Sequence, residues 1–136
     1  MLRRIDERVL VAGQIRRDDM EALKAGGIGM IVNNRPDDEE AGQPSSAEME
    51  AAARAAGIDY RYIPVASGFS ANQVEAMSEA LRDAEGQILA FCRSGTRSTY
   101  LWALARARHG DPAEELMQKA AAAGYDLGPI EALLQR

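Results

Sequence analysis

Residues 87–107 read QILAFCRSGTRSTYLWALARA, and this stretch decides how the rest of the chain is interpreted. It begins with Gln87–Phe91, a short apolar run that is typical of a buried strand. It ends with Thr99–Ala107, whose apolar spacing predicts a helix. Cys92, the only cysteine, therefore lies between a strand end and a helix N-terminus. This order predicts an anion-binding loop, because backbone N–H groups and the positive end of the helix dipole point into it.

The residues around Cys92 suit an activated cysteine. Arg93 and Arg97 carry permanent positive charges, which favour the thiolate over the thiol. The guanidinium of Arg97 can also hold an anion through two parallel hydrogen bonds. A lone cysteine at the end of an apolar strand can instead be an ordinary core residue. We predict that Cys92 and Arg97 are catalytic, within an anion-binding loop that also contains Arg93, Ser94, Gly95, Thr96 and Ser98.

Length and charge exclude several classes of function. The chain has 136 residues, enough for one hydrophobic core, and it contains no repeat or low-complexity tract. We therefore predict a single domain over residues 1–136. The net charge of −5 argues against binding to nucleic acid or to an anionic membrane surface.

The cysteine content and the lengths of the apolar runs indicate the cellular compartment in which the protein is expected. One cysteine excludes an internal disulfide, as expected in a reducing environment. No apolar run approaches the roughly 20 residues of a membrane helix, and residues 1–8 lead into no signal-peptide core. We predict a cytoplasmic protein with no cofactor and no metal. With no second cysteine in this chain, an oxidised or persulfidated Cys92 needs an external thiol to restore it.

Strand and helix patterns alternate along the chain. The runs that predict strands are Val9–Ala12, Ile28–Asn33, Ile58–Val65 and Gln87–Phe91. Helices are predicted over residues 18–24, 45–56, 70–85, 99–107, 112–124 and 128–136, two of them opened by the capping boxes Ser45–Glu48 and Ser70–Gln73. This alternation predicts an α/β fold with a mainly parallel central sheet and helices on both faces.

Polar residues gather at the predicted carboxyl ends of the strands, where sites in such sheets lie. Asn34 and Arg35 follow one strand and are candidate substrate-binding residues, although turn chemistry also explains them. Asp37 and Asp38 begin a run of four acidic residues and could supply an acid, with a solvated loop as the alternative.

Four segments also carry a family resemblance as an ordered set. They are residues 12–15 (AGQI), 31–39 (IVNNRPDDE), 62–65 (YIPV) and 92–98 (CRSGTRS). Together they resemble the phosphatase-like domain of the beta-lactamase hydrolase-like proteins, from about Arg8 to about Gly110. The resemblance implies the fold of dual-specificity cysteine phosphatases. That domain also occurs fused to metallo-β-lactamase-type persulfide dioxygenases, which implies a link to sulfide metabolism and a persulfide dioxygenase as a candidate partner.

The chain departs from the phosphatase pattern in three places. Phosphatases of this type carry a histidine before the cysteine, where this chain has Phe91. They place five residues between cysteine and arginine, and this chain has four. Dual-specificity phosphatases also carry an acid in the region that reads ASGFS here, residues 66–70. The loop itself closely resembles that of single-domain rhodaneses, whose shorter loop suits a terminal sulfane sulfur.

These departures lead us to predict a rhodanese-type sulfurtransferase that works through a persulfide on Cys92. General-acid help to an alkoxide leaving group is worth about 10²–10⁴-fold, whereas sulfur transfer expels sulfite or a thiolate. The expected ligands are a small anionic sulfur donor and an external thiol acceptor. The alternative is a phosphatase-like hydrolase that cleaves phosphate esters through a phosphocysteine. A third interpretation is an inactive anion-binding interaction module.

Overall fold

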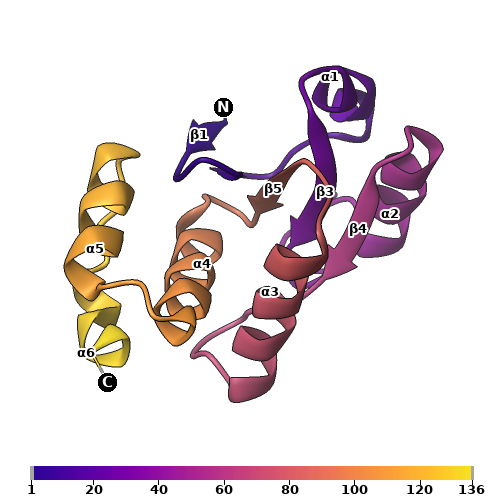
Figure 1. Ribbon diagram of the computed structural model, residues 1–136. Coiled ribbons are helices and arrows are strands. Elements are labelled where there is room, and N and C mark those ends of the chain that lie inside the picture. Colours follow the sequence, from indigo (N-terminus) through magenta and orange to yellow (C-terminus); the bar gives the residue numbers. More distant parts are fainter. Residues whose placement is uncertain (1, 136) are drawn as a thin grey trace.

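The computed structural model describes residues 2–135 and contains one five-stranded sheet between two layers of helices (Figure 1). The strands are β1 (Arg3–Arg4), β2 (Val9–Ala12), β3 (Ile28–Asn33), β4 (Asp59–Tyr62) and β5 (Gln87–Phe91), in the spatial order β1-β2-β5-β3-β4. Only β1 runs antiparallel among the described strands; β2, β5, β3 and β4 pair in parallel. The predicted α/β fold with a mainly parallel sheet is confirmed.

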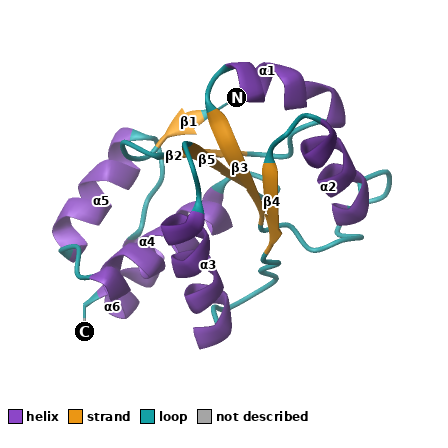
Figure 2. Ribbon diagram, turned by 45° about the vertical axis from the view of Figure 1, so that its right-hand side comes forward, coloured by secondary structure: helices purple, strands orange, loops and turns teal. Residues whose placement is uncertain are grey.

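The helices cover both faces of the sheet (Figure 2). They are α1 (Met20–Ala25), α2 (Ser46–Ala55), α3 (Ala71–Asp83), α4 (Thr96–His109), α5 (Ala113–Ala122) and α6 (Glu131–Leu134), with short 3₁₀ turns at Arg17–Asp19 and Gly128–Ile130. Both predicted capping boxes are present, at the starts of α2 and α3. In residues 2–135, we find no helix with the length and apolar character to cross a bilayer.

The core is divided by the sheet, because successive side chains of a strand point to opposite faces. Along β5, Ile88 and Ala90 belong to a buried cluster that also contains residues of α3, α4, α5 and α6. Leu89 and Phe91 point to the other face and pack with α1 and α2. All four side chains are completely buried. This burial on both faces explains why β5 is a continuous apolar run, and it fixes where the chain leaves the sheet.

β4 is shorter than the strand predicted over residues 58–65. Beyond its end, the N–H of Ile63 donates to the carbonyl of Asn33 and the N–H of Val65 donates to the carbonyl of Asn34. Between these two hydrogen bonds the chain advances by two residues after β4 but by only one residue after β3. The regular pairing of the two strands therefore ends here. The segment nevertheless remains attached to the end of β3, beside the site described below.

Candidate active site

Cys92 lies at the carboxyl end of β5, with β2 and β3 on either side of that strand. Its side chain is completely buried. The N–H of Cys92 donates to the carbonyl of Ala12 at 3.3 Å, which ties it to the end of β2. The N–H of Gly95 donates to the sulfur of Cys92 at 3.1 Å. A backbone donor aimed at the sulfur stabilises negative charge on it.

The helix after this loop begins earlier than predicted. α4 starts at Thr96 rather than Thr99, with Gly95 as its N-cap at a φ of 90°. Thr96, Arg97 and Ser98, which we expected in the loop, therefore form the first turn of the helix. The N–H groups of a first turn have no partners within the helix and attract anions. The anion-binding site thus consists of a very short loop and a helix N-terminus.

The end of β2 lies against the backbone of this loop. A Cβ atom on Gly13 would lie 2.9 Å from the carbonyl oxygen of Arg93, too close for any other residue without a shift. Glycine at position 13 therefore permits this close approach. The side chains of Arg93 and Ser94 are exposed at the surface of the loop, where a ligand can reach them. The Ser94 hydroxyl donates to the hydroxyl of Thr96 at 3.1 Å.

Arg97 is fixed by a carboxylate that the sequence did not single out. Its Nη1 and Nη2 donate to the two oxygens of Glu39 at 2.6 and 3.0 Å, and Nη1 also donates to the carbonyl of Val65 at 2.6 Å. The side chains of Arg97 and Glu39 are only 20% and 25% exposed. The geometry is the two-pronged pairing that arginine makes with carboxylates and phosphates.

The pairing of Arg97 with Glu39 determines the charge that each of these side chains carries. The hydrogen bond with Arg97 is the largest influence on Glu39 and lowers the pKa of its carboxyl. The same bond is the largest influence on Arg97 and raises the pKa of its guanidinium, with a further contribution from the charge of Cys92. Glu39 is therefore a carboxylate and Arg97 a cation near neutral pH. The guanidinium also lies within electrostatic reach of the Cys92 sulfur.

Arg35 does not face an open binding site. Its side chain is 3% exposed, and its nitrogens donate to Glu39 at 2.9 Å, to Glu40 at 3.1 Å and to the side-chain oxygen of Gln14 at 2.9 Å. Arg35 was a candidate substrate-binding residue, with turn chemistry as the alternative. In the structure it instead holds the acidic loop, and so places Glu39 against Arg97.

Asn34 is likewise buried in structural contacts. Its Oδ1 accepts a hydrogen bond from the hydroxyl of Ser98 at 2.8 Å, and its Nδ2 donates to the carbonyl of Ile63 at 2.9 Å. Both Asn34 and Ser98 are completely buried. Asn34 was a candidate substrate-binding residue, with turn chemistry as the alternative, and Ser98 was a candidate ligand donor; in the structure the two side chains bond to each other. The pair ties the first turn of α4 to the end of β3.

The structure places the two candidate acids, Asp37 and Asp38, in other surroundings than Glu39 and Glu40, which follow them in the sequence. One carboxylate oxygen of Asp37 accepts a hydrogen bond from the N–H of Ser46 at 2.7 Å, at the start of α2. Asp38 is exposed and has a φ of 65°. Glu39 and Glu40 are the members of the run that contact the Cys92 loop, and Glu40 lies 3.8 Å from Arg93. The local sequence does not single out Glu39, because residues 34–45 form no helix in which a four-residue spacing would bring Arg35 and Glu39 together.

The amino-acid sequence of this chain is similar to those of a known protein family. A family model described as the phosphatase-like domain of beta-lactamase hydrolase-like protein matches residues 1–109. A beta-lactamase hydrolase-like protein of Agrobacterium fabrum is 41% identical over 108 residues, which are 79% of this chain and 25% of that protein. One from Xylella fastidiosa is 35% identical over 134 residues, 97% of this chain and 31% of that protein. The chain thus spans about a quarter to a third of these relatives.

Solved structures share the fold. A candidate phosphatase from Neisseria meningitidis superimposes with a TM-score of 0.84 and 33% identity, covering 98% of this chain and 95% of that one. A candidate phosphatase from Shewanella putrefaciens gives 0.75 at 23% identity, covering 98% and 87%. A structure titled Tk-PTP gives 0.67 at 19% identity, covering 98% and 92%. These likenesses confirm the predicted cysteine-phosphatase-like fold.

Proposed function

We propose that this chain, which belongs to the family of phosphatase-like domains of beta-lactamase hydrolase-like proteins, hydrolyses phosphate monoesters through a phosphocysteine on Cys92. The observation that carries the proposal is the pairing of a buried cysteine at a helix N-terminus with a fixed guanidinium, that of Arg97. The family and the structural likenesses support phosphate chemistry over the sulfur transfer that we first predicted.

The first step is attack of the Cys92 thiolate on phosphorus. The phosphoryl oxygens accept hydrogen bonds from the free N–H groups of the first turn of α4 and from Arg97, which stabilise the charge that they carry in the transition state. The P–S bond forms as the P–O bond to the alcohol breaks. The electron pair leaves with the alcohol oxygen, which takes its proton from water.

The second step regenerates the enzyme. A water molecule attacks the phosphorus of the phosphocysteine, and the P–S bond breaks as the new P–O bond forms. Inorganic phosphate leaves, the proton of the water passes to solvent or phosphate, and Cys92 returns to the thiolate. The same oxyanion contacts serve both steps.

The protonation state of Glu39 favours one class of phosphate ester over another. Because the hydrogen bond with Arg97 lowers its pKa, Glu39 is ionised at neutral pH and has no proton to give to a leaving group. Glu39 is therefore a positioning residue for Arg97. Substrates whose leaving group is stable as an anion are then favoured, so aryl phosphates should react much faster than alkyl phosphates.

Sulfur transfer is the second candidate, and one observation favours it. Only four residues separate Cys92 from Arg97, which makes the loop shorter than a phosphatase loop. In that reaction the thiolate attacks the outer sulfur of thiosulfate, sulfite leaves with the electron pair of the S–S bond, and Cys92 carries a persulfide. An external thiol or cyanide then removes the sulfur.

A paired assay on one preparation separates the two. One arm measures phosphate release from p-nitrophenyl phosphate and from an alkyl phosphate, and the other measures thiocyanate formed from thiosulfate and cyanide. We expect phosphate release from the aryl ester, little from the alkyl ester, and none with Cys92→Ser. Ser78→Ala, a change on α3, is the control and should keep full activity. Thiocyanate without phosphate release would establish the second candidate, and neither product would indicate a binding module.

A further inference from the structure

Tyr125 contacts the Cys92 loop although it lies beyond the matched residues 1–109. It follows α5, and its hydroxyl donates to the carbonyl oxygen of Ser94 at 3.1 Å, across 31 residues of sequence. We infer that Tyr125 is a positioning residue that holds the Ser94–Gly95 peptide in the orientation required by Cys92. As a statement about catalysis, this inference rests on the proposed phosphatase function.

One peptide group links Tyr125 to Cys92. The carbonyl of Ser94 and the N–H of Gly95 belong to the same peptide, and that N–H donates to the sulfur of Cys92 at 3.1 Å. A peptide group is planar, so fixing the direction of its oxygen also fixes the direction of its N–H. A hydrogen bond accepted by the oxygen further polarises the N–H and strengthens its donation. Tyr125 thus acts on the Cys92 sulfur through a single rigid unit.

Gly95 itself does not select this orientation. Its φ of 90° lies in the left-handed region, and glycine adopts positive and negative φ with similar ease. Glycine alone therefore does not fix the peptide, and the hydroxyl of Tyr125 supplies a contact from outside the loop. A Cβ atom at position 95 would collide with the hydroxyl of Tyr125, so the absence of a side chain allows that contact.

Tyr125 is itself held from two directions. Its N–H donates to the carbonyl of Ala120 at 2.8 Å, where the chain turns at the end of α5. The guanidinium of Arg3, in β1, lies 5.8 Å from the centre of the Tyr125 ring and donates to the carbonyl of Ala123 at 3.0 Å. Burial is the main influence on the phenol and raises its pKa, so it keeps its proton and remains a donor.

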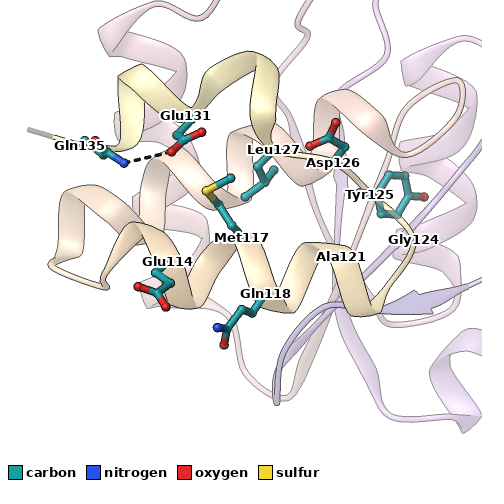
Figure 3. Close-up of a pocket in the computed structure, with 10 residues that line it drawn as sticks. All are labelled: Glu114, Met117, Gln118, Ala121, Gly124, Tyr125, Asp126, Leu127, Glu131 and Gln135. Atoms are coloured by element: carbon teal, nitrogen blue, oxygen red, sulfur yellow. Dashed lines mark hydrogen bonds between the residues drawn. The ribbon is translucent and has the colours of Figure 1, made fainter.

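The position of the ring agrees with this role. Tyr125 lies at one end of a groove of about 820 Å³ between α5 and α6 (Figure 3). Its hydroxyl is directed away from Met117 and Leu127, which line the groove. The hydroxyl therefore points toward the Cys92 loop, and only the ring of Tyr125 lines the groove. The segment after residue 109 thus contacts the site through Tyr125, in the turn that follows α5.

The test compares Tyr125→Phe with Tyr100→Phe, a tyrosine that packs edge-on against Phe69. Tyr125→Phe removes only the hydroxyl, so the melting temperature should fall by about a few degrees at most. Hydrogen exchange of the Gly95 amide, measured by nuclear magnetic resonance, should accelerate by about 3- to 10-fold, the worth of one neutral hydrogen bond. The kcat/KM for p-nitrophenyl phosphate should fall by a similar factor, because both effects follow from the same peptide. Tyr100→Phe should leave both values unchanged.

Unchanged exchange of the Gly95 amide in Tyr125→Phe would overturn the inference. Faster exchange with unchanged kcat/KM would overturn the catalytic part of it, because the peptide would then be held without consequence for the reaction. The exchange measurement needs no turnover. If the wild-type protein releases no phosphate, the proposed function fails while the amide exchange still decides whether Tyr125 orients the loop.

Discussion

Replacement of Glu39 by glutamine is the most informative test of how the site is held together. In the folded protein, the carboxylate accepts hydrogen bonds from Arg97 at 2.6 and 3.0 Å and from Arg35 at 2.9 Å. Glutamine keeps one acceptor oxygen but turns an amide donor toward a guanidinium. At least one of the three charge-assisted bonds is therefore lost.

The expected cost follows from the number and burial of these bonds. A hydrogen bond to a charged group contributes about 1.5–3 kcal/mol, and both side chains are less than a third exposed, so solvent screens the pair only partly. We expect Glu39→Gln to lower the free energy of unfolding by about 1.5–3 kcal/mol at neutral pH. Urea unfolding measures this difference, followed by the fluorescence of the single, buried Trp102.

The effect should also depend on pH, with a definite sign. The hydrogen bond with Arg97 lowers the pKa of Glu39 in the folded protein from its ordinary value of 4.5. A carboxyl with a lowered folded pKa stabilises the protein fully above its unfolded pKa, and this stabilisation is lost as the pH falls through the folded value. The difference between wild type and Glu39→Gln should therefore be largest near neutral pH and shrink as the pH falls below 4.5.

Glu50→Gln is the matched control. Glu50 pairs with Arg54 at 2.9 Å on the exposed surface of α2, and such pairs contribute only about 0.3–0.5 kcal/mol. Equal unfolding free energies for wild type and Glu39→Gln at neutral pH would refute the account of this pair. A difference that stayed constant down to strongly acidic pH would refute its electrostatic origin.

Three further substitutions test other parts of the site. Arg97→Lys keeps the charge but cannot make two parallel bonds, so kcat/KM should fall by about 10²-fold; Arg82→Lys, on α3, is its control. Asn34→Ala leaves two buried polar partners without hydrogen bonds and should cost about 2–4 kcal/mol of stability in urea unfolding. Gly95→Ala strains a positive φ and crowds the hydroxyl of Tyr125, so the kcat/KM for p-nitrophenyl phosphate should fall at least about 10-fold.

The local features of the site could be predicted from the sequence. The apolar run of β5, the position of Cys92 after it and the following helix all follow from patterns within about 20 residues. The capping boxes marked the starts of α2 and α3 for the same reason. β1 could not be found in this way, because its two residues are too few to show a period.

The contacts that complete the site depend on tertiary packing. Four consecutive acidic residues look alike in sequence, and the side-chain contacts of Arg35 decide that Glu39 rather than Asp37 meets Arg97. The contact of Tyr125 with Ser94 depends on how α5 packs against α4. Our prediction of sulfur transfer came from three local departures, whereas the family match over residues 1–109 and the likeness to a candidate phosphatase favour the phosphatase-like alternative.

The most direct test of the account is the chemical identity of the intermediate on Cys92. The protein is mixed with p-nitrophenyl phosphate, quenched in denaturant within one turnover, and analysed by intact mass spectrometry and peptide mapping. The proposed mechanism predicts a single phosphoryl group on the peptide that contains Cys92, and none with Cys92→Ser. A protein that never gains a phosphoryl group, but gains one sulfur atom from thiosulfate, would contradict it.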